Sequence, residues 1–376
     1  MGSAAKSDNN CPLIWALGAL PPPVNGMTLL TEKVIQRIEQ EQPVTVINWS
    51  AGDPRTRLQT RALRLLRAVC GLARLLMHGR VRNARLFITG NSQAGLFMTG
   101  LLVRSGRALG YNICLHHHSY LYIDQFDRKM AWIDRMMTAS DMHLVHCPQM
   151  ADEFRAKYQT KAQFEFLYPS IVSLPLGKSR QTARQPMQLG HMAHLSVAKG
   201  LDLVLETFRE LRKKGRDVQL SLAGPYHTAD AKRMVEGAIK ENDGWITHLG
   251  GVYGDGKTEF FKSIDCFLFP SRTESWGIVL NEAMAAGVPV ISTDRGCVRT
   301  FVANGAGLVV NDEKHFVTEA VRQVEVWIDS QEDYSTASRA AISQADHLHR
   351  EAAAQLEHLV SHICSPPDAP EAQAAV

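Results

Sequence analysis

Residues 264–293 constrain the fold of this chain most strongly, because they predict a strand, a loop, a helix and a second strand in direct succession. The first strand is Cys266 to Phe269, an apolar run that Pro270 ends. A helix is expected from near Gly277 to Gly287, and the second strand from Val288 to Ile291. This order is typical of open α/β sheets, which bind ligands where the carboxyl end of a strand leads into a helix.

Two glutamates mark this segment as a candidate site. Glu274 lies on the predicted loop, and Glu282 lies eight positions later inside the predicted helix. The N–H groups from Ser275 to Val279 and the partial positive charge at the helix start would face any anion bound there. The sequence therefore predicts an anion site with two carboxylates beside it.

The whole stretch PSRTESWGIVLNEAMAAGVPVIST resembles the signature of the family 4 retaining glycosyltransferases, which has two glutamates separated by seven residues. The alternative is a loop glutamate and an ordinary helix glutamate in another α/β enzyme. The resemblance implies an α/β protein with the GT-B fold. In that fold two Rossmann-like domains face each other across a cleft, and a C-terminal helix crosses back to the first domain.

The length of 376 residues suits two domains of ordinary size. The polar stretch SLPLGKSRQTARQP has no periodicity and is the best candidate for the linker between them. We expect disorder at both ends of the chain. The predicted parts are an N-terminal acceptor-side domain at 11–172, a linker at 173–186, a C-terminal nucleotide-sugar-binding domain at 187–332, crossover helices at 333–363, and disordered ends at 1–10 and 364–376.

Neither a signal peptide nor a membrane-spanning segment is expected, because the first ten residues are polar and no stretch of eighteen apolar residues occurs. We therefore expect a cytoplasmic protein. The net charge is only +3, but residues 55–85 hold nine arginines and no acidic residue. The predicted helix at 56–79 has apolar residues on one side and Arg57, Arg61, Arg64, Arg67 and Arg74 mainly on another. Such a helix either sits on an anionic membrane, making the protein peripheral on the cytoplasmic face, or is a core helix with a solvated basic face.

The first domain begins with a predicted strand from Leu13 to Leu20, the turn PPPVNGM containing Gly26, and a helix. This turn resembles the loop that covers the donor phosphates in bacterial polysaccharide transferases of the family. A plain surface turn is the alternative. If the loop does contact the donor, Gly26 would allow its backbone to approach closely.

Three histidines follow the predicted strand from Tyr111 to Leu115. Adjacent residues of an extended chain point to alternate sides, so at most two of His116, His117 and His118 share a side, and no acidic or cysteine ligand follows at a suitable spacing. We therefore expect no metal site. By the resemblance, His118 would contact the donor sugar; His116 points to the same side and is the alternative.

In the second domain, Lys199 precedes a predicted helix, where a cation is disfavoured by the helix dipole unless it meets a bound anion. This stretch resembles the second signature of the family, an arginine five residues before Lys-Gly, except that His194 stands at the arginine position. A second departure is the absence of the usual Pro-Glu after the glycine in DRGCVRTF. By the resemblance, the turn at Gly224 lies near the nucleotide and the segment at Val252 reads the base.

The resemblance implies a retaining transferase that uses a nucleoside-diphosphate sugar and needs no metal and no other cofactor. In it Lys199, with His194, would meet the diphosphate, Glu282 would accept the ribose hydroxyls, and Glu274 would hold a hydroxyl of the reacting sugar. The residues assigned to donor binding are Gly26, His194, Lys199, Gly224, Val252, Trp276, Gly277, Ile278, Val279 and Glu282, and those assigned to catalysis are Glu274 and His118.

The expected acceptor is a glycan, lipid-linked rather than soluble, in polysaccharide or glycoconjugate biosynthesis, and no nucleic acid partner is expected. Two alternatives remain open at this point. One is a nucleotide-sugar epimerase of the same fold. The other is a catalytically silent homologue that acts as a membrane-associated assembly partner.

Overall fold

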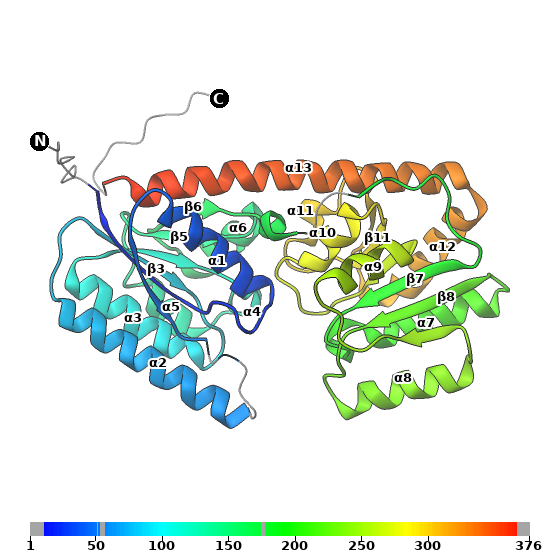
Figure 1. Ribbon diagram of the computed structural model, residues 1–376, viewed down its shortest axis with the longest axis horizontal. Helices are drawn as coiled ribbons and strands as arrows, with labels where there is room; N and C mark the ends of the chain where they lie inside the picture. The colour runs from blue at the N-terminus through cyan, green and yellow to red at the C-terminus, as the bar shows by residue number, and fades with distance from the viewer. Residues whose placement is uncertain (1–10, 51, 53–56, 174–176, 367–376) are drawn as a thin grey trace, which may run out of the picture. The chain divides into compact units, whose positions relative to one another are not determined.

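The computed structural model of the protein describes residues 11–50, 52, 57–173 and 177–366 (Figure 1). These residues group into two compact units. Unit 1 is Met1–Tyr168 with Ala352–Val376, and unit 2 is Pro169–Glu351. Disorder was expected at 1–10 and 364–376. Residues 1–10 and 367–376 lie outside the described residues, whereas Cys364 is the last residue of the final helix.

Unit 1 contains a parallel six-stranded sheet in the order β2-β1-β3-β4-β5-β6. Its strands are β1 (Leu13–Gly18), β2 (Val44–Asn48), β3 (Ala84–Thr89), β4 (Asn112–His116), β5 (Met142–Val145) and β6 (Gln163–Phe166). Its helices are α1 (Gly26–Glu39), α2 (Arg57–His78), α3 (Gly95–Leu109), α4 (Leu121–Asp124), α5 (Arg128–Asp134) and α6 (Pro148–Tyr158). The central strands are buried along almost their whole length, as in sheets covered by helices on both faces.

Helix α2 has an exposed apolar side. The side of α2 that meets the sheet carries Gly71, so the helix lies very close to β2. A Cβ on Gly71 would be 2.7 Å from Cγ2 of Ile47. Ala68 and Leu75 are buried beside it. The larger apolar side chains point outward: Leu65 is 59% exposed, Leu66 58%, Val69 48% and Leu76 51%. A core helix with a solvated basic face would bury these side chains, so the described part of α2 does not fit that alternative.

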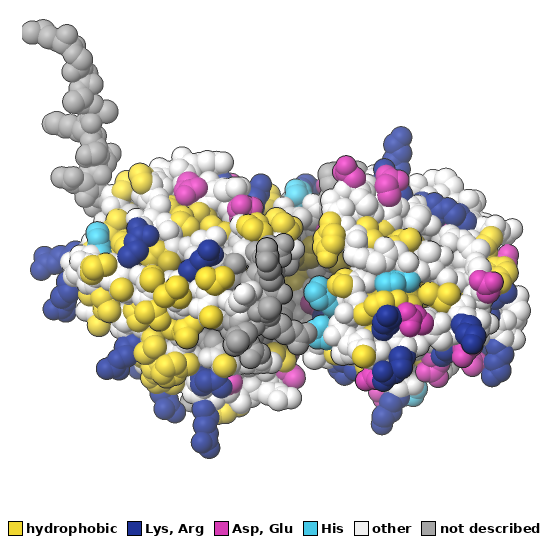
Figure 2. All heavy atoms as spheres, turned by 60° about the horizontal axis from the view of Figure 1, so that its bottom comes forward, with side chains coloured by type: hydrophobic (Ala, Val, Ile, Leu, Met, Phe, Trp, Pro, Cys, Tyr) yellow, Lys and Arg dark blue, Asp and Glu magenta, His cyan; other side chains and the backbone are white. Residues whose placement is uncertain are grey.

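Figure 2 shows hydrophobic side chains gathered among lysines and arginines on the face of unit 1 turned to the viewer. Arg64 and Arg74 of α2 are exposed, whereas Arg67 also donates a hydrogen bond to the backbone oxygen of Ser50. The side chains of Arg57 and Arg61 lie outside the described residues. Among the described helices, none has both the length and the apolar character needed to cross a bilayer.

Unit 2 contains a second parallel six-stranded sheet in the order β12-β11-β10-β7-β8-β9. Its strands are β7 (Met187–Met192), β8 (Val218–Ala223), β9 (Ile246–His248), β10 (Cys266–Phe269), β11 (Val290–Thr293) and β12 (Gly307–Val310). Its helical segments are η1 (Pro169–Val172), η2 (Val197–Lys199), α7 (Leu201–Lys213), α8 (Ala229–Glu241), α9 (Asp255–Ser263), α10 (Ile278–Ala285), α11 (Val298–Phe301), η3 (Glu313–His315) and α12 (Phe316–Asp329).

Residues 178–186, within the predicted linker, belong to unit 2 and are held there by two arginines. The guanidinium of Arg180 donates to backbone oxygens at the end of α9 and, at 3.0 Å, to Oδ1 of Asp265. Arg184 donates to the same carboxylate oxygen at 2.7 Å. The last helix, α13 (Gln331–Cys364), starts in unit 2, and its residues from Ala352 onward group with unit 1.

Candidate active site

The loop between β10 and α10 carries the first glutamate of the sequence pattern and ends in a tight turn. Gly277 is the N-cap of α10 and has a φ of 83°, a left-handed conformation that favours glycine. Trp276 is buried and stacks on Phe301, with ring centroids 4.6 Å apart. Ile278 and Val279 are partly exposed in the first turn, where backbone N–H groups have no partner within the helix. Anion binding at this helix start stays a prediction.

Lys199 and Glu274 form an ion pair at this helix start. Nζ of Lys199 lies 2.9 Å from Oε2 of Glu274 and 2.9 Å from the backbone oxygen of Thr273. The other carboxylate oxygen of Glu274 accepts a hydrogen bond of 3.1 Å from the N–H of Ser275. The cation that the sequence placed unfavourably before α7 thus has a carboxylate partner, and the structure brings together two residues that were assigned to different parts of the donor.

Arg272 links the loop that carries Lys199 to the loop that carries Glu274. Its guanidinium makes a two-pronged contact with the carboxylate of Asp202 at 2.7 and 2.8 Å, and its Nε donates to Glu313 at 2.8 Å. Its backbone N–H donates to the oxygen of Ala198. Because Ala198 precedes Lys199, these contacts fix the position of Lys199 relative to Glu274.

Two glycines allow the backbones around the pair to approach closely. A Cβ on Gly200 would lie 2.0 Å from the backbone oxygen of Pro270. A Cβ on Gly296 would lie 2.4 Å from the backbone oxygen of Glu274. Gly296 belongs to the loop that lacks the expected Pro-Glu, so this loop still packs on the glutamate loop despite that departure.

Glu282 is buried on α10, and its two carboxylate oxygens have different surroundings. Oε1 accepts a hydrogen bond of 2.6 Å from Nζ of Lys257 on α9. Oε2 is buried and has no hydrogen-bond partner among the described residues. Burial raises the pKa of Glu282, and Lys257 partly opposes that shift. One oxygen is therefore held in place, and the other is available to a donor such as a hydroxyl.

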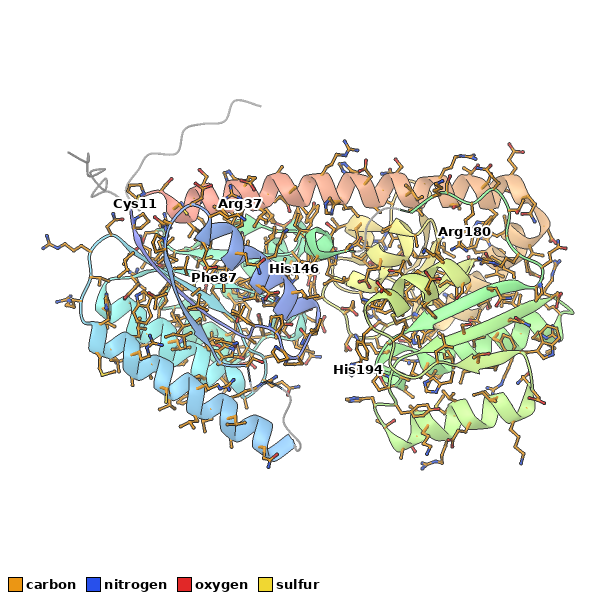
Figure 3. The ribbon with its side chains drawn as sticks, in the orientation of Figure 1. Cys11, Arg37, Phe87, His146, Arg180 and His194 are labelled. Carbon is orange, nitrogen blue, oxygen red and sulfur yellow. The ribbon has the colours of Figure 1, made fainter. Side chains whose placement is uncertain are left out.

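His194 lies in the loop after β7, where its side chain is exposed (Figure 3). Its ring lies 6.3 Å from that of His227. Partial burial, His227 and Lys199 all lower the pKa of His194. In the absence of a ligand the imidazole is therefore uncharged at neutral pH, unlike an arginine at this position.

The turn after β8 is built around Gly224, whose φ is 116°. A Cβ there would lie 1.8 Å from the backbone oxygen of Ala193, so this turn packs directly on the loop that carries His194. The backbone oxygen of Gly224 accepts a hydrogen bond of 2.9 Å from His248. Val252 is partly exposed in the loop between β9 and α9, the same loop that leads to Lys257.

In unit 1, Gly26 is the first residue of α1, after the N-cap Asn25. The side chain of Asn25 accepts from the N–H of Thr28, and Oγ1 of Thr28 accepts from the N–H of Asn25. Gly26 is not among the residues with positive φ, so this position does not require glycine for its backbone conformation. A close approach of a ligand stays a prediction for Gly26.

The three consecutive histidines alternate as expected. His116 and His118 lie on one side, with ring centroids 3.9 Å apart. His117 points to the other side, where its Nε2 lies 2.8 Å from Nδ1 of His143 and its Nδ1 lies 2.9 Å from the hydroxyl of Tyr122. Burial is the largest cause that lowers the pKa values of His116, His117 and His118, so these imidazoles are neutral at pH 7.

Sequence reasoning missed three residues, each of which lies near a predicted site residue of its own unit. Lys257 stands in the first turn of α9, so the dipole argument that singled out Lys199 applies to it as well. His146 follows β5, the neighbour of β4 in the sheet, and a correct strand order would have placed it beside His118. Asn281 is buried on α10 with no hydrogen-bond partner among the described residues for its amide, and no sequence signal points to it.

The family model for glycosyl transferases group 1 matches residues 178–344. The phosphatidyl-myo-inositol mannosyltransferase of Mycobacterium leprae is 32% identical over 155 residues, which are 38% of this chain and 40% of that protein. The capsular polysaccharide biosynthesis glycosyltransferase CapM of Staphylococcus aureus is 28% identical over 136 residues, which are 35% of this chain and 32% of that protein. The chain thus matches 40% of the length of the mycobacterial relative and 32% of the length of CapM.

Two solved structures match nearly the whole chain. Sucrose-phosphate synthase from Thermosynechococcus elongatus has a TM-score of 0.68 at 16% identity and covers 94% of this chain and 99% of its own. HepE of Anabaena, solved with UDP, has a TM-score of 0.63 at 14% identity and covers 92% of this chain and 100% of its own. At these identities the likeness shows the fold. The chain therefore has the GT-B fold, and its residues 178–344 match the family model for group 1 glycosyl transferases.

Proposed function

We propose that the protein is a retaining, metal-independent glycosyltransferase that moves a sugar from a nucleoside-diphosphate sugar to a lipid-linked glycan. The observation that carries this proposal is the ion pair of Lys199 and Glu274 at the start of α10, with Glu282 buried on the same helix. HepE has been solved with UDP-glucose, which supports a nucleotide-sugar donor. The names of the mannosyltransferase and CapM support a glycolipid or polysaccharide acceptor.

The pair of Lys199 and Glu274 suggests how donor binding prepares the site. A diphosphate competes with Glu274 for Nζ of Lys199, so the arriving donor releases the carboxylate to a hydroxyl of the sugar. As the nucleoside diphosphate leaves, its growing negative charge meets Lys199 and the N–H groups at the start of α10. These fixed positive groups act where a metal ion acts in other transferases. His118 is proposed to contact the donor sugar.

A donor screen tests this function. Purified protein is incubated in EDTA with a panel of UDP, GDP, ADP and dTDP sugars, with and without a lipid-linked acceptor, and nucleotide release and the anomeric configuration of the product are measured. We expect acceptor-stimulated release from one donor and retained configuration. Isomerised nucleotide sugar would indicate an epimerase, and no turnover of any donor would favour the silent assembly partner. Loss of activity in EDTA with rescue by a divalent ion would contradict metal independence.

His194 is expected to make donor affinity depend on pH. A bound diphosphate stabilises the imidazolium, so the pKa of His194 is higher in the complex than in the free protein, where it is lowered. Affinity should then be highest below the free-protein pKa and fall as pH rises through the pKa of the complex. His194→Arg should bind the donor tightly at both ends of this range, because arginine stays charged.

The measurement is a pair of calorimetric titrations with the nucleotide sugar found in the screen, at about pH 5.5 and about pH 8.5 on either side of the usual histidine pKa. The nucleotide sugar is used because its diphosphate diester does not titrate between these values. His194→Ala should lose affinity mainly at the acid end. Equal pH dependence in the wild type and His194→Arg would remove His194 from the donor site.

We further propose that α2 attaches the protein to anionic membranes. Its exposed Leu65 and Leu66 lie beside Arg64, a combination of apolar and basic side chains suited to a membrane surface. Each leucine buried in the interface contributes about 1.5 kcal/mol or more, so Leu65→Ser with Leu66→Ser should weaken vesicle binding by about 100-fold. Arg64→Gln with Arg74→Gln should weaken it less, by about 1 kcal/mol per charge, and remove much of its salt dependence.

The test is co-sedimentation with vesicles of phosphatidylglycerol and phosphatidylcholine at low and high salt. Val326→Ser is the matched control, because Val326 is an exposed apolar residue of α12 in unit 2 and is expected to change nothing. Turnover of soluble donor should be unchanged in all these variants. If the wild type does not bind the vesicles, α2 does not attach the protein to membranes and is only an exposed helix.

A further inference from the structure

Three histidines of unit 1 lie together at the carboxyl ends of neighbouring strands. His116 ends β4, His118 follows two residues later, and His146 follows β5. Each offers one ring nitrogen, and these three atoms all lie within 4.8 Å of one another. His146 is labelled in Figure 3. Its ring centroid lies 5.6 Å from those of His116 and His118. Because β4 and β5 are parallel neighbours, the sheet itself brings these side chains to one place.

The innermost histidine of this cluster has polar atoms that the protein does not satisfy. His116 is fully buried, and neither of its ring nitrogens has a hydrogen-bond partner among the residues that the structure describes. Phe87 and the two other histidines surround its ring. A buried polar atom without a partner is destabilising, so a ligand that binds a ring nitrogen of His116 would stabilise the protein.

The strand end that carries the cluster is held firmly from its other side. The backbone N–H of His117 donates to the oxygen of Leu144, and the oxygen of His116 accepts from Gly90 at 2.7 Å. The ring of His117 continues a buried chain through His143, whose Nε2 lies 3.2 Å from Oδ1 of Asp134. A backbone hydrogen bond at Leu167 engages His146. A hydrogen bond to a metal-binding histidine, such as this one at His146, fixes the orientation of the ring in known sites.

We propose that His116, His118 and His146 form a binding site for a transition-metal ion, with Zn²⁺ as the expected occupant. Three neutral imidazoles suit zinc and its neighbours in the transition series, whereas Mg²⁺ and Ca²⁺ prefer oxygen ligands, which this cluster lacks. Nitrogens on a tetrahedral zinc lie about 3.4 Å apart, given bonds of about 2.05 Å, so small rotations of the rings close the site. His118, which is only partly buried, gives the ion a route in and leaves a fourth position for water or a ligand.

The site predicts inhibition by zinc rather than activation, and this part rests on the proposed function. His118 is proposed to contact the donor sugar, and a bound metal would occupy the same imidazole. Zinc should therefore compete with the donor, and EDTA should restore full activity. The metal-independent reaction and the metal site are thus compatible, because the ion is an inhibitor and not a participant.

Binding is tested on chelator-treated protein from which any histidine tag has been removed. Calorimetry with Zn²⁺ should give one site per chain, and Co²⁺ should produce the strong visible absorption of a four-coordinate complex. His116→Ala and His146→Ala should each weaken zinc binding by at least about 100-fold, because even the contacts behind such ligands are worth 10–100-fold. His347→Ala, which changes an exposed histidine of α13, is the matched control and should bind as the wild type does.

Zinc should also raise the melting temperature of the wild type and not that of the two variants, since only a ligand that binds the folded state stabilises it. If an alanine variant fails to fold, His116→Asn or His146→Asn is used in its place, because asparagine keeps the polarity of the site. A wild type that binds no zinc, or variants that bind it with unchanged affinity, would overturn the proposal.

Inhibition is tested by measuring turnover with and without zinc in the wild type, His116→Ala and His146→Ala. The ratio of the two rates is compared between the proteins. Inhibition in the wild type that is lost in His116→Ala and His146→Ala supports the placement of His118 at the donor. Specific zinc binding without any inhibition would leave the metal site standing and contradict the proposed role of His118. Failure of the metal site and failure of the proposed function are therefore distinguishable.

Discussion

Glu274→Gln is expected to lower turnover by about 100- to 1,000-fold, the loss seen when one group that stabilises a transition state is removed, while donor affinity changes little. Glutamine keeps the shape of the side chain, and its amide oxygen still accepts from Nζ of Lys199, which lies 2.9 Å from the carboxylate in the free protein. What the variant loses is the negative charge that would orient and polarise a hydroxyl of the reacting sugar. Because Lys199 is then less strongly held, the diphosphate should bind as well as before or better.

The measurement separates binding from chemistry, with calorimetry for the donor and single-turnover kinetics for transfer. Glu325→Gln is the matched control, because Glu325 is also an ion-paired glutamate of unit 2, bonded to Lys214 and Arg216 on its surface. That variant should leave both constants unchanged. Near-normal turnover with a raised Michaelis constant in Glu274→Gln would move Glu274 from the reacting sugar to a binding role.

The strand at the start of the segment 264–293 was predicted well because its signals are local. Cys266–Phe269 has the predicted bounds, since it is a short apolar run that Pro270 ends. The strand after α10 was placed two residues too early, and it begins at Val290, after Pro289. Proline has no N–H to donate to a sheet, so the first paired residue follows it.

Helix α2 shows what periodicity leaves undecided. Its pattern located the helix and the apolar side correctly, yet a pattern does not tell whether that side meets the core or faces away from it. The missing side chain of Gly71 lets α2 sit against Ile47, with Ala68 and Leu75 buried beside it. Leu65, Leu66 and Leu76 are then left outside. Packing distance decided the outcome, and a single sequence does not reveal it.

Contacts between side chains far apart in the chain were the least predictable part of the site. The pairing of Lys257 with Glu282 depends on where α9 and α10 lie in unit 2, and the meeting of His146 with His118 depends on β4 and β5 being neighbours. Both follow from the order of strands in a sheet. The residues that sequence motifs did identify, such as Lys199 and Glu274, are close together because two successive signatures of one family meet at the carboxyl ends of adjacent strands, β7 and β10.

Glu282→Ala is expected to weaken the binding of UDP, used as the probe, by about 10- to 100-fold. A hydrogen bond to a charged group contributes about 1.5–3 kcal/mol, and Oε2 of Glu282 is a buried acceptor without a partner among the described residues, suited to a ribose hydroxyl. Glu282→Gln should fall between alanine and the wild type, because it keeps an acceptor and loses the charge.

Stability distinguishes this binding role from a structural one. Burial raises the pKa of Glu282 in the folded protein, so the ionised group destabilises the fold at any pH above its unfolded value, and this cost is relieved as pH falls through the folded pKa. Glu282→Gln should therefore leave the melting temperature at pH 7 unchanged or raised while UDP affinity falls. Its partner Lys257 is partly exposed and can be solvated when the carboxylate is gone.

The pH dependence of UDP binding tests whether the ionised form of Glu282 is the one that binds. In the wild type, UDP affinity should fall as pH falls through the raised pKa of Glu282, since a protonated carboxyl is a weaker acceptor, and this loss should be absent from Glu282→Gln. Lys257→Met should shift the loss to higher pH, because Lys257 favours the ionised form of Glu282. Glu236→Gln, on the exposed surface of α8, is the matched control. If Glu282→Ala binds UDP as tightly as the wild type, then the unpartnered oxygen does not face the ribose, and the nucleotide must be sought elsewhere in unit 2.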